Sequence, residues 1–270
     1  MAAVIPGQDE LARLIRTASQ AAGRHLDVAG TLNFRDAGGY PVAGGAQVRW
    51  RTLLRSDALD QLGPGALEQF ASLGLRTVVD LRTAEEAALA PGPAAGLARL
   101  GAVTTSISLL GEVTQDLRPE LGAIYDFIVD RRGAEIATAI SALARPGGLP
   151  ALVHCSAGKD RTGIVIGLVL AAVGVPDEVV AADYALTGLY LDPRHTPVIG
   201  RLSQSTGLGD DTVTALLACP PELMLGLLGR VRRHGGSIEG YLAGHGVSPA
   251  DLAALRAALV TGGEPEPDGP

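Results

Sequence analysis

An apolar run, a short polar loop and a second apolar run follow one another between residues 149 and 173. The first run, Leu149 to Val153, has the length of a buried strand, and the second, Ile164 to Val173, has that of a helix. Cys155 and Arg161 lie six positions apart in the loop. A strand that enters a tight loop and then a helix turns loop N–H groups toward one point, where the helix N-terminus adds positive potential. The segment therefore predicts an anion site at a strand end.

The side chains of this loop predict a specific chemistry. A thiol beside a helix N-terminus and an arginine is favoured as the thiolate, so Cys155 is expected to be a nucleophile. The guanidinium of Arg161 offers a planar fork for two phosphate oxygens. The plainer interpretation of a lone cysteine after a strand is a buried core residue. The joint pattern His-Cys-x5-Arg-Thr-Gly is much rarer, and it describes a phosphate held over a nucleophilic sulfur.

Other kinds of site do not fit these residues. A Walker-type nucleotide loop needs Ser or Thr after its lysine, whereas Lys159 is followed by Asp160. Cys155 and Cys219 are far apart in the chain, and the five histidines are scattered without ligand spacing. We therefore expect no redox motif, no metal and no cofactor.

The segment HCSAGKDRTG, residues 154–163, resembles the signature loop of the cysteine-dependent protein tyrosine phosphatases, in the form found in a bacterial and fungal family that includes a secreted mycobacterial enzyme. Upstream blocks resemble the same family in the same order: Asn33 to Asp36 with Gly38 and Gly39, Leu54 to Asp57, and Val79 to Arg82 followed by Glu85. The resemblance covers residues 25–190. It implies hydrolysis of phosphate monoesters through a phosphocysteine intermediate, and some members also accept phosphoserine, phosphothreonine or phosphoinositides.

Within this interpretation each loop residue has an expected role. Cys155 attacks phosphorus, while Arg161 and the loop N–H groups stabilise the equatorial oxygens in the transition state. Thr162 is expected to donate its hydroxyl to the Cys155 sulfur, and His154 to orient the loop rather than act as a base. Lys159 is expected to contact the phosphate or a second anionic group, the alternative being a solvated loop charge. The phosphate-binding residues are then Ser156, Ala157, Gly158, Lys159, Asp160 and Arg161.

A general acid must also protonate the leaving oxygen. The usual tyrosine phosphatase carries this aspartate in a Trp-Pro-Asp loop, but the one tryptophan here, Trp50, lies in Arg-Trp-Arg-Thr. Asp160 inside the loop and Asp80 at a strand end remain as candidates. We favour Asp160, because the plainer role of Asp80 is to pair with an arginine such as Arg82 or Arg55.

Strands that alternate with helices predict an α/β fold with a largely parallel central sheet flanked by helices. β-branched runs place strands at Val48–Leu54, Thr77–Leu81, Val103–Ile107 and Ala151–His154. Helical patterns occupy Gly7–Ala22, Gly65–Leu73, Glu120–Val129 and Ala134–Ala144. Ligand sites in such sheets lie beyond the carboxyl ends of the strands, which is where Cys155 is placed.

We expect one phosphatase domain over residues 1–262 and a disordered tail over 263–270, which is rich in Pro, Gly and acidic residues. After Thr187, Gly and Pro separate short helical stretches, which lie at Thr212–Ala218, Pro221–Arg233, Ser237–Ala243 and Pro249–Leu259. The C-terminal part is therefore expected to be helical. Residues 188–245 are expected to form a lid, as the resemblance implies, or alternatively to complete the core.

The net charge of −7 argues against a nucleic-acid partner, whereas binding one phosphate needs only local positive charge. No signal peptide and no apolar run long enough to span a membrane are visible. A thiolate nucleophile requires a free thiol, which favours a reducing, cytoplasmic location, with signal-less secretion left open. These features do not predict the oligomeric state.

The leading prediction is hydrolysis of phosphotyrosine, with phosphoserine and phosphothreonine as further substrates. The alternative is a small-molecule phosphate monoester, such as a phosphoinositide, a nucleotide or a biosynthetic intermediate, in a wider pocket that Lys159 and Asp160 would favour. The partner is accordingly a phosphorylated protein or a small phosphate monoester. An inactive phosphate-binding module would lack Cys155 or Arg161, and a redox or arsenate-reducing role would need a second cysteine near Cys155.

Overall fold

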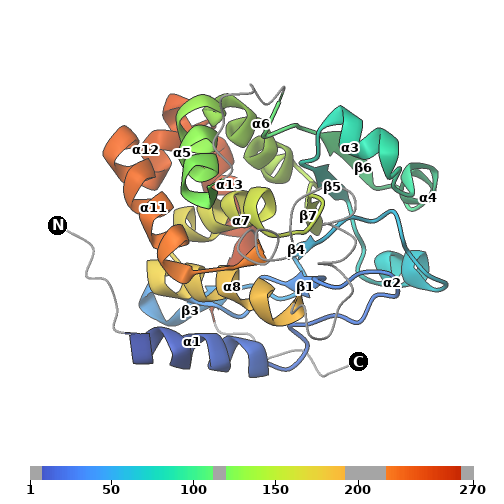
Figure 1. Ribbon diagram of the computed structural model, residues 1–270, viewed down its shortest axis with the longest axis horizontal. Helices are drawn as coiled ribbons and strands as arrows, with labels where there is room; N and C mark the ends of the chain where they lie inside the picture. Colours follow the sequence, from blue (N-terminus) through green and yellow to red (C-terminus); the bar gives the residue numbers. More distant parts are fainter. Residues whose placement is uncertain (1–7, 112–119, 192–216, 263–270) are drawn as a thin grey trace.

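The computed structural model describes residues 8–111, 120–191 and 217–262, and these are built around a five-stranded sheet (Figure 1). The strand order is β1-β4-β7-β5-β6. Strands β4, β7, β5 and β6 are parallel, and β1 pairs antiparallel with β4 at one edge. The prediction of a largely parallel central sheet is therefore confirmed. The strands are β1 (Arg35–Asp36), β4 (Leu53–Ser56), β5 (Thr77–Asp80), β6 (Val103–Ser106) and β7 (Ala151–His154).

Helices flank this sheet, and a second, three-stranded sheet of order β2-β3-β8 lies beside it. Its strands are β2 (Pro41–Val42), β3 (Ala46–Val48) and β8 (Val260–Thr261). The helices before the active-site loop are α1 (Gln8–Gln20), α2 (Ala66–Ser72), α3 (Ala84–Leu89), α4 (Ala94–Arg99), α5 (Leu121–Arg131) and α6 (Gly133–Ala144). Those after it are α7 (Asp160–Ala172), α8 (Asp177–Tyr190), α11 (Pro221–Gly235), α12 (Ile238–Gly244) and α13 (Pro249–Leu259).

Alternate residues of the central strands belong to two different hydrophobic clusters. Leu53, Val79 and Val153 belong to the larger cluster, while the neighbouring Leu54, Val78 and Leu152 belong to the smaller one. Successive strand residues point to opposite faces, so both faces of the sheet are covered. The smaller cluster contains residues of α2 and α4 and the stacked rings of Phe34 and Phe70.

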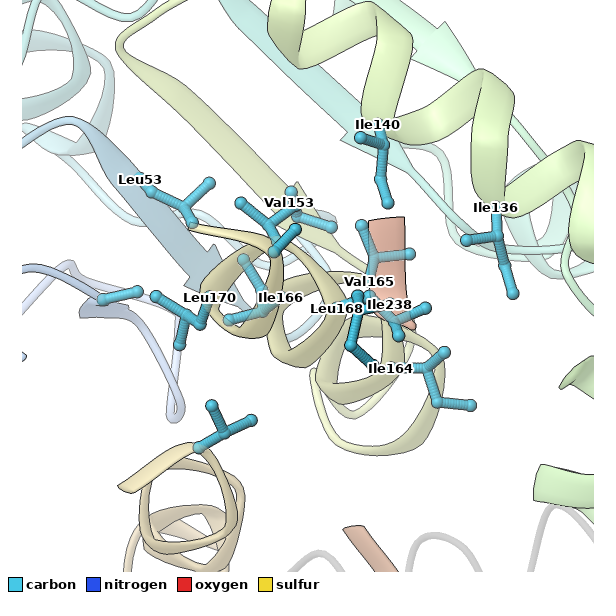
Figure 2. Close-up of a cluster of buried hydrophobic side chains, with 14 of the residues drawn as sticks. Leu53, Ile136, Ile140, Val153, Ile164, Val165, Ile166, Leu168, Leu170 and Ile238 are labelled. Carbon is cyan, nitrogen blue, oxygen red and sulfur yellow. The ribbon is translucent and has the colours of Figure 1, made fainter. Parts of the chain in front are cut away.

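Helix α7 is the centre of the larger cluster, which explains why its sequence is apolar on all sides. Figure 2 shows its side chains lying between the sheet residues Leu53 and Val153 and the isoleucines of α6 and α12. The α7 residues labelled there are Ile164, Val165, Ile166, Leu168 and Leu170. Because α7 is buried so fully, the loop that precedes it is attached to the most rigidly packed part of the fold.

The register of the parallel strands places the expected site at one edge of the sheet. His154 at the end of β7 is level with Ser56 at the end of β4 and Asp80 at the end of β5. Cys155 follows directly, beyond the carboxyl ends of these strands. This is the position at which open α/β sheets bind ligands, as the sequence predicts.

The described C-terminal region is helical, as expected, and α11 and α12 pack into the core. Met224, Leu228 and Val231 of α11 are fully buried, and so is Leu242 of α12. This packing does not decide between the lid and the core-completing alternative, which stays a prediction. The remainder of the 188–245 lid prediction falls mainly on residues 192–216, and those residues, like the 263–270 tail, lie outside the described ranges.

The observed elements differ from the expected ones in several places. The single strand expected at Val48–Leu54 is divided into β3 and β4 by a turn in which Arg51 has φ 58°. The carboxylate of Asp36 stabilises this turn by accepting the Arg51 N–H at 2.6 Å, a contact that strand propensity does not reveal. Helices α3 and α4 were also not predicted, because each spans only six residues.

Candidate active site

A five-residue loop connects β7 to α7, running from Cys155 to Lys159, with α7 beginning at Asp160. Cys155 is 2% exposed at the start of the loop. Gly158 has φ 65°, and a Cβ atom there would lie 2.3 Å from the carbonyl oxygen of Ser56. Only glycine fits this position, so the loop is held tightly against the end of β4.

Arg161 lies in the first turn of α7 and is bound by a glutamate from α3. Its Nη1 atom lies 2.5 Å from Oε2 of Glu86, and its Nη2 atom lies 2.8 Å from Oε1. The Ser156 hydroxyl donates to the same carboxylate at 2.6 Å. Burial raises the pKa of Glu86, but the hydrogen bonds and charge of Arg161, with smaller effects of Ser156 and the Thr83 amide, lower it to about 2. The guanidinium beside Cys155 is therefore held in one orientation.

Glu86 is a partner of Arg161 that the sequence pattern did not identify. The resembled block points to Glu85, which is exposed, whereas the adjacent Glu86 faces Arg161. Glu86 is also the third residue of a capping box, in which its carboxylate accepts the Thr83 N–H at 2.8 Å and its own N–H donates to the Thr83 hydroxyl at 3.2 Å. The spacing Thr-x-x-Glu could have revealed both this short helix and the position of Glu86.

Asp80, the second candidate for the general acid, is paired with an arginine. Its oxygens accept hydrogen bonds from Arg82 Nε at 2.9 Å and Nη2 at 2.7 Å, and His154 Nε2 lies 3.8 Å away. Although burial raises the pKa of Asp80, the hydrogen bonds of Arg82 and the charge of His154 lower it overall. The structure thus places Asp80 in the ion pair with Arg82 that the sequence suggests as its alternative role.

Asp160, the favoured candidate, lies at the junction of the loop and α7. Its Oδ1 atom accepts a hydrogen bond from the Tyr125 hydroxyl at 3.0 Å and lies 3.1 Å from Nζ of Lys159. The Asp160 side chain is 27% exposed, whereas that of Lys159 is 1% exposed. Burial excludes the interpretation of Lys159 as a solvated loop charge. Asp160 keeps access to solvent.

His154 and Thr162 have different relationships to the loop. His154 Nδ1 lies 3.4 Å from the carbonyl oxygen of Cys155, and burial lowers the pKa of this histidine despite the opposing charge of Asp80. The role of His154 in orienting the loop stays a prediction. The buried Thr162 hydroxyl makes no hydrogen bond to any described residue, so the expected bond to the Cys155 sulfur is not formed. The side chain of Thr162 is instead enclosed at the buried start of α7.

An apolar cluster flanks the other side of the loop. Ala157 packs against Leu32, Leu191 and Leu217. Leu191 and Leu217 are the described residues that border the range 192–216. The side of the loop at Ala157 is therefore packed against buried apolar side chains.

The other upstream blocks form a buried polar cluster behind the loop. Arg35 and Arg55 are both completely buried, and both bind the carboxylate of Asp183 on α8. Burial raises the pKa of Asp183, but the charges of Arg55 and Arg35 lower it to about 2. Asp183 is therefore a carboxylate that joins the two blocks to each other and to α8.

Comparison with known proteins identifies the family of this chain. A model of the tyrosine phosphatase family matches residues 26–261. The chain belongs to this family. Its sequence is 30% identical to a protein of Cupriavidus necator named as a tyrosine-protein phosphatase, over 91% of this chain and 92% of that protein. It is 27% identical to the triple specificity protein phosphatase PtpB of Mycobacterium tuberculosis, over 87% of this chain and 98% of PtpB.

A tyrosine-protein phosphatase of Nostoc commune is 29% identical over 76% of this chain and 73% of that protein. The activity of this tyrosine phosphatase family member is accordingly that of a phosphatase, a hydrolase acting on a phosphorylated substrate. Across residues 8–111, 120–191 and 217–262, no three His, Cys, Asp or Glu side chains gather as metal ligands would. None of the described helices is long and apolar enough to span a membrane.

Proposed function

We propose that this tyrosine phosphatase family member hydrolyses phosphotyrosine in proteins, with phosphoserine and phosphothreonine as further substrates, through a phosphocysteine intermediate. The observation that carries the proposal is the pairing of Glu86 with Arg161 directly beside Cys155. This pairing presents a fixed cationic fork next to a buried thiol at a helix N-terminus. Relatives named for action on tyrosine, and one named for triple specificity, support protein substrates.

The proposed reaction has two displacement steps. In the first, the Cys155 sulfur attacks phosphorus, the bond from phosphorus to the tyrosine oxygen breaks, and Asp160 gives its proton to that oxygen. In the second, water attacks phosphorus, the phosphorus–sulfur bond breaks, and Asp160 accepts a proton from the water. Arg161 and the loop N–H groups stabilise the charge on the equatorial oxygens in both transition states.

Both cysteines are free thiols, Cys155 buried and Cys219 half-buried. A mechanism that depends on a reduced thiol supports action in a reducing compartment, which we propose is the cytoplasm. The positive potential that a phosphate needs is supplied by Arg161 and the start of α7. We therefore propose that the reaction proceeds without a metal or another cofactor.

A small-molecule phosphate monoester is the second candidate substrate. The observation in its favour is the buried ammonium of Lys159, which lies 3.1 Å from Asp160 at the edge of the loop. A second cation two positions before Arg161 in the chain suits a ligand that carries more than one anionic group, such as a phosphoinositide or a nucleotide.

A phosphate-release panel distinguishes these candidates. Peptides carrying phosphotyrosine, phosphoserine or phosphothreonine are compared with phosphoinositides and nucleotides, with and without a chelator. Phosphotyrosine peptides should give the highest kcat/KM, and the chelator should have no effect. Faster release from an inositol or nucleotide phosphate would favour the second candidate. No release from any monoester would contradict both.

A further inference from the structure

The side chain of Asn33, which lies just before β1, binds two consecutive carbonyl oxygens of the active-site loop. Asn33 Nδ2 donates to the carbonyl oxygen of Ala157 at 3.1 Å and to that of Gly158 at 3.0 Å. An amide nitrogen carries two hydrogens, so each carbonyl can receive its own. Arg55 Nη2 adds a second donor to the Gly158 carbonyl at 2.8 Å. Asn33 and Arg55 thus hold the loop from behind.

The preceding loop peptide is held in a similar way. The carbonyl oxygen of Ser156 accepts the backbone N–H of Ala58 at 3.1 Å. In a trans peptide the C=O and the N–H point in opposite directions. Binding the carbonyls on one side of the loop therefore turns the N–H groups of Ala157, Gly158 and Lys159 toward the other side. Among the described residues, the N–H groups of Ala157 and Gly158 have no acceptor, which leaves them available to an anion.

The orientation of the Asn33 amide is fixed by its surroundings. Its Oδ1 atom accepts a hydrogen bond from Arg35 Nη1, and a guanidinium can only donate. The Asn33 oxygen must therefore face Arg35, and its NH2 group must face the loop. Asn33 is completely buried, and its backbone N–H donates to Asp57 at 3.0 Å. No rotation of the amide is open to it without breaking these bonds.

Both arginines in this arrangement depend on Asp183. Arg35 Nε lies 3.4 Å from Oδ1 of Asp183, and Arg55 Nη1 lies 2.5 Å from Oδ2. Arg35 Nη2 also donates to the backbone carbonyl oxygen of Asp183 at 2.9 Å. One buried carboxylate on α8 therefore orients the two side chains that in turn orient Asn33 and the loop.

We propose that Asn33 is a positioning residue for the phosphatase reaction, and that Arg55 shares this role at Gly158. Together they keep the loop carbonyls away from the phosphate and the loop N–H groups directed at it. Without them a carbonyl can rotate toward the ligand, where its partial negative charge repels a phosphate oxygen. The inference rests on the proposed function only in taking a phosphate-like anion as the ligand.

The test compares vanadate affinity with folding stability. Asn33→Ala removes both donors to the loop, and the expected result is vanadate binding weaker by about tenfold or more. Tyr40→Phe is the matched control, because the Tyr40 hydroxyl donates to the same Asp183 at 2.9 Å and does not touch the loop. It should lower the Tm and leave vanadate affinity within about twofold.

Arg55→Lys provides a second variant if Asn33→Ala does not fold. A lysine can keep the charge next to Asp183 but lacks the fork that also reaches the Gly158 carbonyl, so vanadate affinity should fall by about threefold to tenfold. Unchanged vanadate affinity in a folded variant would overturn the inference. So would losses no larger than those of Tyr40→Phe. Failure of the wild-type protein to bind vanadate would instead contradict the proposed function.

Discussion

Glu86 binds Arg161 through both carboxylate oxygens, at 2.5 and 2.8 Å, and also binds the hydroxyl of Ser156. A residue of α3 thus fixes a residue of α7 across the end of the sheet. The Arg161 side chain is 10% exposed, so water has little access to these hydrogen bonds. Arg161 is therefore already held in position in the ligand-free protein. Electrostatic stabilisation of a transition state requires such preorganised groups.

Substitution of Glu86 should reduce activity although this residue does not touch the reacting atoms. Glu86→Gln keeps the shape of the side chain and removes its charge, so Arg161 loses a charged partner and one of its two acceptors. We expect kcat/KM for a phosphotyrosine peptide to fall by about tenfold to a hundredfold, as for other charge-assisted pairs. Glu85→Gln, an exposed neighbour on the same helix, is the control and should retain wild-type activity. Equal effects of the two substitutions would contradict the role of Glu86.

The same pair should be visible in the pH dependence of stability. The pKa of Glu86 in the folded protein is about 2, below its ordinary value of 4.5. A lowered carboxylate pKa contributes stability above the unfolded pKa and loses it as the pH falls through the folded pKa. The difference in unfolding free energy between wild type and Glu86→Gln should therefore shrink as the pH falls from about 4.5 to about 2. Chemical denaturation at several pH values measures it, and a constant difference would count against the charged pair.

Substitution of Asp160 and of Asp80 should have effects that depend differently on the leaving group of the substrate. The acid matters most when the leaving oxygen is basic, as in tyrosine with a pKa of about 10. Asp160→Asn should slow hydrolysis of a phosphotyrosine peptide far more than that of an activated aryl phosphate. Asp80→Asn should slow all substrates together, because it releases Arg82 and disturbs the end of β5. The reverse pattern would make Asp80 the acid.

The sheet, α7 and the position of Cys155 were predictable because they depend on local periodicity. Strands β5 and β7 coincide closely with the apolar, β-branched runs, and α7 with the long apolar run after the loop. The turn at Arg51 could not be predicted in this way, because the carboxylate of Asp36, which is distant in the sequence, stabilises a left-handed conformation there. Local propensity carries no information about such a contact.

Within the site, the sequence identified the side chains of the active-site loop better than the residues from other elements that bind them. Glu86 was not singled out, and its neighbour Glu85, which belongs to the resembled block, is turned by about 100° on the helix and away from the Arg161 guanidinium. The role of Asp183 was not predicted at all, because it lies within the mainly apolar helix α8 and acquires its partners only through tertiary packing. For Thr162 the sequence analysis predicted a hydrogen bond to the Cys155 sulfur, and the Thr162 hydroxyl makes no hydrogen bond to any described residue.

Trapping the covalent intermediate tests the central claim most directly. Wild-type protein is mixed with excess phosphotyrosine peptide, quenched in acid within milliseconds and digested, and the peptides are analysed by mass spectrometry. The mechanism predicts one phosphoryl group on the sulfur of Cys155, formed before phosphate is released, and no turnover by Cys155→Ser. Phosphate release without phosphorylated Cys155, together with turnover by Cys155→Ser within about tenfold of wild type, would contradict it.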